Sequence, residues 1–569
     1  MLLQGARVPE QNDEKPCLVE TGRGFSVLYK NRFLYSRYDP SKNILAAVAS
    51  LNILPGTLIL ACSPCLGLGL SELSAKLPEN CLILGCECDG ELYTFAQEHI
   101  VRPRNFSLLS PSELSALPVL LNKRAVVLGD GTELPPQGTL RRVIRVDFSA
   151  GTQFAPQYYQ ALSRASEDAV GRFWKNRITL VKLGRKYSRN LFRNLSRLPD
   201  SAPFEQFVHT ITKPVLVLGA GESMEDTARK LAPCRNTMYI AAADAALPSL
   251  LALGVVPDAV VCEEAQSAIA PAFLGAQGKN THIFAGITSW PAVHDFVGGK
   301  EKISYFATKY DDTLFFERLS GGHILPPVIP PLGSVGLTAV YLALLFRSDD
   351  SVPVFVSGLD FSYSPGCTHA RGTPARTARL CAGNRTVPAA NYDAAFGFGS
   401  SAAACKNGGT VYTTPVLLSY AQTFSGLFHA EKNVFDAGTT GIALGLEHRD
   451  VSCVFEKSGS AQCAAEASVP HTDTDRQRLI THFYDAEEKA LCELRDILSH
   501  GQHMNETERN ERITKLLTAR EYLFLHFPDG YRLSLSPSFL KRVRAETDFF
   551  LKDIRTGKQL LSGCEKRAD

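Results

Sequence analysis

Short apolar runs alternate with polar turns and helix-like segments through the middle of the chain, and this alternation restricts the folds available to it. Val215 to Leu218 is followed by a glycine turn and a helical pattern, and Tyr239 to Ala242 repeats the arrangement. Further strands are expected at Ala259 to Cys262, Thr281 to Gly286, Ile303 to Ala307 and Val352 to Ser357. Strands that alternate with helices form a parallel sheet covered on both faces. We therefore expect an α/β fold with a central Rossmann-type domain at 214–465.

The flanking segments predict further domains. Thr57 to Cys62 and Cys81 to Glu87 enclose helical spacing at Leu70 to Leu77, which is the pattern of a βαβ unit. Ala125 to Leu128 and Val143 to Phe148 are expected to continue that sheet. The predicted organisation is a β-rich segment at 1–45, a smaller Rossmann-like domain at 46–154, a basic helical linker at 155–213, the central domain at 214–465 and a helical domain at 466–569.

The predicted linker carries nine cations with no acidic residue between them: Arg172, Lys175, Arg177, Lys182, Arg185, Lys186, Arg189, Arg193 and Arg197. A solvated helix face is one explanation, and a surface that meets phosphate or a partner is the other.

Composition excludes several classes of protein. A net charge of +2 argues against a dedicated nucleic-acid binder. No stretch approaches the ~18 apolar residues of a membrane span. The start of the chain lacks the pattern of a signal peptide, and the 15 scattered cysteines suit a reducing compartment, so we expect a cytoplasmic protein.

Two motifs lie at the ends of the first two central strands. Gly219 and Gly221 open a turn that leads through Ser223 into a helix, where a capping box with Asp226 is expected. Such a turn brings backbone N–H groups close to an anion. Asp244 ends the next strand, at the edge where open α/β sheets bind ligands. A ligand-free turn and a simple helix cap are the alternatives.

Two more motifs follow. Ser334 and Thr338 belong to a Gly/Ser loop that enters an apolar helix, and Ser357, Gly358 and Asp360 end the last predicted strand. His369 lies in the loop that follows, where it is placed to act as a base. A plain helix entry and a surface loop histidine are the alternatives for these two motifs.

The order of these motifs resembles the domain-of-unknown-function-115 proteins, which include the motility accessory factors and are related to bacterial sialyltransferases and MptE-like pterin diphosphokinases. The resemblance covers roughly residues 30 to 450 and is strongest at 214–372. It includes Gly254-x-x-Pro257-Asp258, Gly67-Leu68-Gly69 and the segments around Thr413 and Gly441.

The resemblance implies a glycosyltransferase that moves a nonulosonic acid, a sialic-acid-like sugar, from a CMP donor to Ser or Thr of flagellin. It implies that Gly219, Gly221, Ser223 and Asp244 bind CMP. Ser334, Thr338, Ser357, Gly358 and Asp360 would line the rest of the donor site. His369 would be the base, and His369 and Asp360 are the residues expected to be catalytic. The expected partners are the CMP-sugar and flagellin, with no nucleic acid and no membrane span.

Two departures from the family pattern leave other functions open. Glu222 stands where the family prefers Pro, and Glu263 stands where Asp is usual. One alternative is a 6-hydroxymethylpterin diphosphokinase that uses ATP and Mg²⁺, held by carboxylates such as Asp244 and Glu263. Another is a flagellin-binding assembly factor with no activity.

Four cysteines near two predicted strand ends raise the question of zinc. Cys62 and Cys65 follow one strand, and Cys86 and Cys88 follow the next. Their spacings do not form the usual paired knuckles of a structural zinc site. We therefore expect small residues in turns and assign no metal ligand.

Overall fold

The computed structural model describes residues 15–123, 126–136, 138–297, 302–308, 313–386, 392–455 and 473–565. The chain forms two compact units, residues 1–181 and 182–569. The long helix α5 (Pro156–Leu195) runs through the boundary between them. The five segments expected from the sequence remain a finer prediction than this division.

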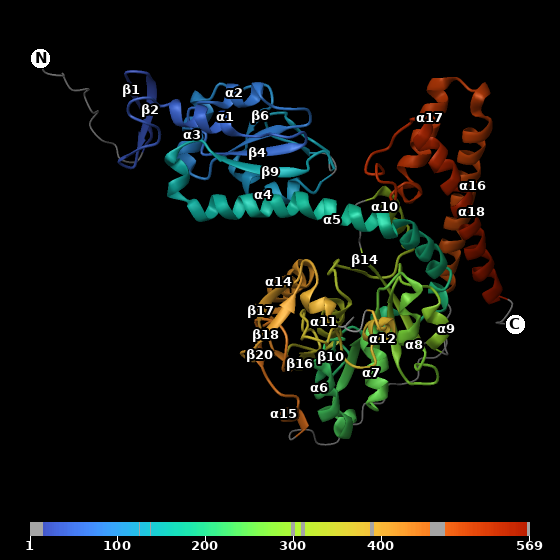
Figure 1. Cartoon of the computed structure of the whole chain (residues 1–569). Helices are drawn as coiled ribbons and strands as arrows, with labels where there is room; N and C mark the ends of the chain where they lie inside the picture. The colour runs from blue at the N-terminus through green and yellow to red at the C-terminus, as the bar shows by residue number, and fades with distance from the viewer. Residues whose placement is uncertain are drawn as a thin grey trace, which may run out of the picture. The chain divides into compact units, whose positions relative to one another are not determined.

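The first unit contains a small parallel sheet (Figure 1). Its strand order is β6-β5-β4-β9. The strands are β4 (Thr57–Cys62), β5 (Leu82–Cys86), β6 (Phe106–Leu108) and β9 (Arg142–Asp147). The unit's helices before α5 are α1 (Lys42–Ser50), α2 (Leu70–Ala75), α3 (Gly90–His99) and α4 (Pro111–Leu120). The expected βαβ unit is therefore present.

Two small antiparallel sheets complete the first unit. The β-rich start is formed by β1 (Cys17–Thr21), β2 (Gly24–Tyr29) and β3 (Arg32–Phe33). The expectation that Ala125 to Leu128 continues the parallel sheet is wrong. β7 (Val126–Val127) instead pairs with β8 (Glu133–Leu134) across a short turn that contains Gly131 with φ +84°. The parallel strand β6 was not expected from the sequence. It has only three residues, which is too short for a recognisable apolar run.

The second unit is built on one nine-stranded sheet in the order β15-β14-β13-β12-β11-β10-β16-β19-β20. Each strand in it pairs with its neighbours in parallel. The strands are β10 (Val215–Leu218), β11 (Tyr239–Ala243), β12 (Ala259–Cys262), β13 (His282–Gly286), β14 (Ile303–Thr308), β15 (Val328–Ile329), β16 (Val354–Ser357), β19 (Val434–Asp436) and β20 (Glu447–His448). The expected Rossmann-type α/β fold is confirmed.

The chain reverses its direction of winding beside β10. It leaves β10 for β11 and proceeds outward to β15, then returns to place β16 on the other side of β10. Open α/β sheets bind ligands at such a reversal, outside the carboxyl ends of the strands. The topology therefore predicts a ligand site outside the carboxyl ends of β10 and β16.

Helices cover both faces of this sheet, and each strand alternates its side chains between two cores. Leu216 and Leu218 of β10 face a core that contains α6 (Met224–Leu231), α7 (Leu247–Ala252), α8 (Ala270–Phe273) and α10 (Leu314–Gly321). Val215 and Val217 face a core with α11 (Val335–Phe346) and α14 (Pro415–Phe428). α9 (Val293–Val297), α12 (Pro374–Ala382), α13 (Asp393–Phe396) and α15 (Ser452–Phe455) lie in connections, as does the hairpin of β17 (Ser401–Ala404) and β18 (Thr410–Thr413).

The C-terminal helices share the first of these cores. They are α16 (Thr474–His500), α17 (Glu506–Thr518) and α18 (Pro537–Glu565). Phe192 of α5 stacks on Phe483 of α16 and contacts Phe550 of α18 edge-on. Among the described residues, no helix combines the length and the apolar character needed to cross a bilayer.

The basic run in α5 has an intramolecular role that neither explanation from the sequence included. Arg185 Nε lies 2.8 Å from Glu546 Oε2, and Arg193 Nη2 lies 2.8 Å from Asp553 Oδ1, both on α18. The Arg185 guanidinium also stacks on the Phe549 ring at 3.8 Å. These cations therefore hold α18 against the end of α5.

Candidate functional site

Two glycine turns, one after β10 and one after β16, lie against each other outside the ends of these strands. We call them the interlocked turns. Gly219 N donates to Ser357 O at 2.8 Å, and Gly221 N donates to Gly358 O at 2.8 Å. A Cβ at Gly219 would lie 2.3 Å from Gly358 O, and a Cβ at Gly358, where φ is +73°, would lie 2.4 Å from Gly219 O. The glycines are thus required by the approach of one turn to the other.

This contact predicts a large effect for Gly219→Ala. Because the clash is with a backbone oxygen, the turns must move apart, which we expect to lower the free energy of unfolding by at least about 2 kcal/mol. Gly426 in α14 is a matched control, since its added Cβ meets nothing within 4 Å. Gly426→Ala should be neutral or slightly stabilising. Equal thermal melting curves for the two variants would contradict the interlock.

Ser223 and Asp360 join the same turns through their side chains. Ser223 N donates to Asp360 Oδ2 at 3.0 Å, and the Ser223 hydroxyl makes a short hydrogen bond to Asp360 Oδ1. Gly358 N donates to Ser223 Oγ at 2.9 Å. The expected capping box is wrong, because the Ser223 side chain is committed to Asp360 and makes no cap hydrogen bond.

Asp360 is therefore held inside the turns. It is 5% exposed, and burial raises its pKa to about 6 against the opposing effect of the Ser223 hydrogen bonds. Both carboxylate oxygens accept from Ser223. The structure gives Asp360 a positioning role in the turns, and a catalytic role for it stays a prediction.

Asp244 follows β11, the strand beside β10. The residue is 4% exposed; its Oδ1 accepts from Ala245 N at 2.7 Å, and its buried Oδ2 has no hydrogen-bond partner of normal geometry in the described part of the chain. Burial, together with the charges of Glu264 and Glu263, raises the pKa of Asp244 to about 7, against the opposing effect of the Ala245 N–H and the neighbouring Cys262 thiol. A buried carboxylate oxygen without a partner is costly, which points to a ligand that supplies one.

Glu263 directly follows the next strand, β12, and its carboxylate is hydrogen-bonded to the first turn of α11. Thr338 Oγ1 donates to Glu263 Oε2 at 2.6 Å, and Thr308 Oγ1 donates to Oε1 at 3.2 Å. Burial raises the pKa of Glu263. Thr338 is thus engaged with protein, and Ser334 stands at the N-cap of α11 without a side-chain cap bond.

His369 lies on a loop that is fixed to the first glycine turn. Ala370 N donates to Ala220 O at 2.9 Å. Glu225 of α6 accepts from Arg371 N at 2.7 Å and from Arg371 Nε at 2.8 Å. The loop therefore places His369 at the same edge of the nine-stranded sheet as the other predicted site residues.

The imidazole of His369 suits a base. Its Nδ1 is buried and has no hydrogen-bond partner among the described residues. Burial, together with the charges of Arg379 and Arg376, lowers the pKa of His369 below its ordinary value. The ring is therefore neutral at neutral pH, which is the form that accepts a proton.

One charged group at this edge was not expected from the sequence. Lys406 Nζ bonds both oxygens of Asp436 at 2.9 and 2.8 Å, at the end of β19. A Cβ at Gly438 would lie 2.8 Å from Ser223 Oγ and 2.9 Å from this Nζ, so the ion pair adjoins the Ser223 network. A single Lys in a Gly/Asn turn gives no sequence signal, because the fold alone brings it there.

Cys62, Cys65, Cys86 and Cys88 are not placed together as a metal site. No group of three or more His, Cys, Asp or Glu in the described ranges is placed to hold one. Cys62 and Cys86 are paired in register on neighbouring strands. Burial raises the pKa of Cys62 and of Cys65 to about 12, which disfavours the thiolates that zinc requires.

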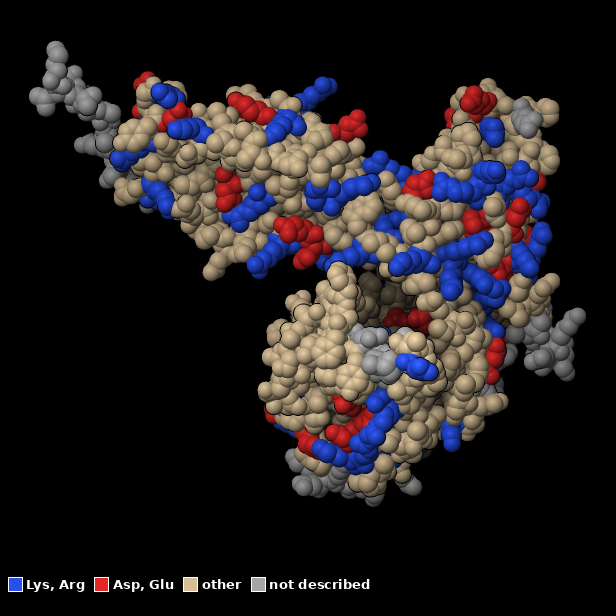
Figure 2. All heavy atoms as spheres, in the orientation of Figure 1, with Lys and Arg blue, Asp and Glu red and all other residues tan. Residues whose placement is uncertain are grey.

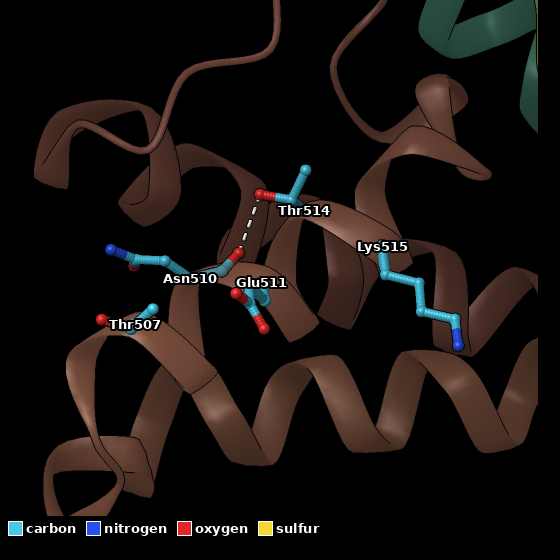
Figure 3. A pocket seen from close by; sticks show the side chains of 5 residues that line it. All are labelled: Thr507, Asn510, Glu511, Thr514 and Lys515. Carbon is cyan, nitrogen blue, oxygen red and sulfur yellow. Dashed lines mark hydrogen bonds between the residues drawn. The ribbon is translucent and has the colours of Figure 1, made fainter.

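A hollow of about 500 Å³ lies on the C-terminal helices and is distinct from the sheet edge. Figure 3 shows its lining side chains, which all belong to α17: Thr507, Asn510, Glu511, Thr514 and Lys515. The hydroxyl of Thr514 donates to Asn510 O at 2.8 Å, within the helix itself. One solvated helix face offers no convergent chemistry, so the candidate site remains the edge of the nine-stranded sheet.

Comparisons with known proteins cover both this region and the whole chain. Residues 189–366 match the family described as 6-hydroxymethylpterin diphosphokinase MptE-like. A protein of Treponema pallidum (strain Nichols), named "Uncharacterized protein", is 32% identical over 565 residues and is aligned over 94% of each chain. The chain belongs to the MptE-like family. The membership expected from the motifs is thereby confirmed.

This MptE-like chain is also similar in fold to a solved structure described as MAf glycosyltransferase from Magnetospirillum magneticum AMB-1. The identity is 15% and the TM-score 0.48, over 96% of this chain and 92% of that chain. The matched family range contains both glycine turns, Asp244, Thr338 and Asp360, and it ends three residues before His369.

Proposed function

We propose that the second unit is a glycosyltransferase that takes a nonulosonic acid from a CMP donor and transfers it to Ser or Thr hydroxyls of flagellin. The observation that carries the proposal is the buried, unpartnered Oδ2 of Asp244 at the end of β11. In Rossmann-type sites a carboxylate at the end of the second strand accepts hydrogen bonds from a ribose. Asp244 suits the ribose of CMP, whereas the N–H groups of Gly219, Gly221 and Ser223 already donate to protein oxygens and hold the turns together.

The reaction needs little from the protein beyond positioning and one base. The acceptor oxygen forms a bond to the anomeric carbon while the bond from that carbon to the phosphate oxygen breaks. CMP leaves with the electron pair, and the acceptor proton passes to His369. The transition state has oxocarbenium character, as in glycoside hydrolysis. A buried neutral imidazole on a loop tied to α6 fits the role of base.

The second candidate function is a pterin diphosphokinase, which the description of the matched family favours. It would require Mg²⁺ to bridge the ATP phosphates. Both oxygens of Glu263, one of the two carboxylates expected to hold Mg²⁺, already accept hydrogen bonds from Thr308 and Thr338. The glycosyltransferase therefore explains the arrangement of Asp244 and Glu263 better than the diphosphokinase does.

Thermal shift separates the two functions. We expect CMP, at about 100 times its dissociation constant, to add about 2.7 kcal/mol to the free energy of unfolding of the second unit. ATP with Mg²⁺ should add nothing. Stabilisation by ATP with Mg²⁺ alone would support the diphosphokinase, and stabilisation by neither nucleotide would support an assembly factor without activity. Uridine monophosphate serves as the control for a non-specific effect of the phosphate.

A further inference from the structure

One stretch of the second unit is almost free of charge. Between Arg385 and Glu431 the sequence contains only Asp393 and Lys406 as charged residues, although 21% of the whole chain is charged. Lys406 is engaged with the buried Asp436. Figure 2 shows a broad uncharged surface over α14, β17 and β18, in contrast to the charged surface over α16 and α18.

Large apolar side chains are exposed on this stretch. Phe398 is fully exposed, and Phe396, Val416 and Tyr392 are 59%, 58% and 50% exposed. We call these four side chains the apolar face. Exposed apolar groups that gather in one place mark interaction sites, and aromatic residues dominate such sites.

Two members of the apolar face, Phe396 and Tyr392, are linked to the loop of His369 through a chain of contacts. The Phe396 ring lies 4.8 Å from the Tyr412 ring, and Tyr412 pairs with Tyr363 through backbone hydrogen bonds of 2.7 and 2.9 Å. The Tyr363 ring lies 6.4 Å from the imidazole of His369. A Cβ at Gly366, three residues before His369, would lie 2.9 Å from the Tyr392 ring. A ligand that contacts Tyr392 and Phe396 would therefore lie near the loop that carries His369.

The neighbouring strand offers backbone as well as side chains. In the described part of the chain, β17 pairs only with β18. Its residues are Ser and Ala, and three of the four are exposed. A short strand with small side chains and one open edge suits the addition of an extended peptide, whose main chain completes the ladder.

We propose that the apolar face and the open edge of β17 bind the acceptor as an extended, uncharged polypeptide segment, with its Ser or Thr hydroxyl at His369. The inference rests on the proposed function and deepens it, because it assigns the acceptor subsite. The absence of charge between Arg385 and Glu431 selects a segment whose residues beside the hydroxyl are apolar or small. The contacts to Tyr363 and Gly366 favour an acceptor over a second copy of the chain, since only an acceptor has to reach the base.

Fluorescence anisotropy with the full chain tests the inference. The probe is a short fluorescein-labelled peptide of Ala, Val and Gln with one central Thr, and the comparison peptide has Asp and Lys in place of the Val residues. Wild type should bind the uncharged peptide and discriminate against the charged one. Phe398→Asp should weaken binding of the uncharged peptide at least tenfold, because an exposed aromatic anchor is lost. Leu479→Asp is the matched control, since Leu479 is 44% exposed on α16 and far from β17 in sequence.

Several outcomes overturn the inference. A wild type that binds neither peptide does so, as does a Phe398→Asp variant that binds the uncharged peptide normally. Size-exclusion chromatography that shows a wild-type dimer and a Phe398→Asp monomer, without peptide binding, would make the apolar face a contact between copies. Thermal shift with CMP on the same samples keeps the two proposals apart. If CMP does not stabilise the wild type, the proposed transferase is refuted. Peptide binding tests the acceptor subsite alone.

Discussion

His369→Ala is expected to transfer the sugar at least about 100-fold more slowly than wild type while it binds CMP almost normally. Removal of a general base typically costs about 10²- to 10⁴-fold in rate. The proton moves only in the transition state, so ground-state binding of the donor is spared. The measurement is turnover of a CMP-nonulosonate with an acceptor peptide, together with calorimetric CMP binding.

The pH dependence gives the same test a second readout. Burial and the charges of Arg379 and Arg376 lower the pKa of His369, so the neutral base persists below pH 6.5. The acidic limb of the rate profile should therefore lie below pH 6.5 in wild type. His503→Ala is the control, because His503 is exposed in the 3-10 turn (Gly501–His503) that follows α16. Unchanged turnover in His369→Ala would remove the imidazole from the mechanism and leave the base to be sought elsewhere.

Asp244→Asn is expected to stabilise the protein without ligand while it weakens donor binding. Burial raises the pKa of Asp244 to about 7 from an ordinary value of 3.8. The folded state therefore holds its proton more tightly than the unfolded state, and the free energy of unfolding falls as pH rises from about 4 to about 7. The ionised carboxylate costs the folded state on the order of 4 kcal/mol at pH 8.

The neutral amide avoids that cost. Asp244→Asn should exceed wild type in thermal stability at pH 8, and the difference should shrink as the pH is lowered toward 4, where Asp244 is protonated in both states. A variant less stable than wild type at pH 8 would mean that Asp244 holds the fold together as a cap. A buried carboxylate that lowers the free energy of unfolding is expected where the group has a function in binding or catalysis.

The sequence predicted six of the nine strands of the second unit, because these six are buried apolar runs, whereas the short strands β15, β19 and β20 were not expected. β10, β12 and β13 lie within one residue of their expected bounds. The meeting of the Gly219 and Gly358 turns could not be predicted in the same way. It depends on β16 returning beside β10, which is a property of the topology and leaves no local signal.

The misjudged features have a common physical origin. Ser223 has a residue pattern typical of a cap, but Asp360, 137 residues later, competes for its hydroxyl. The basic run of α5 looks solvated until Glu546 and Asp553 of α18 are brought against it. Local patterns predict local structure, and long-range partners decide which hydrogen bonds and ion pairs form.

The central claim is that Asp244, directly after β11, binds the ribose of CMP. Isothermal titration of CMP into wild type and Asp244→Asn tests it most directly, with circular dichroism to show that both are folded. The account predicts saturable binding by wild type and at least tenfold weaker binding by the variant, since a ribose hydrogen bond to a charged group contributes about 1.5–3 kcal/mol. Equal affinity in the two proteins, or no binding of CMP by wild type, would contradict it.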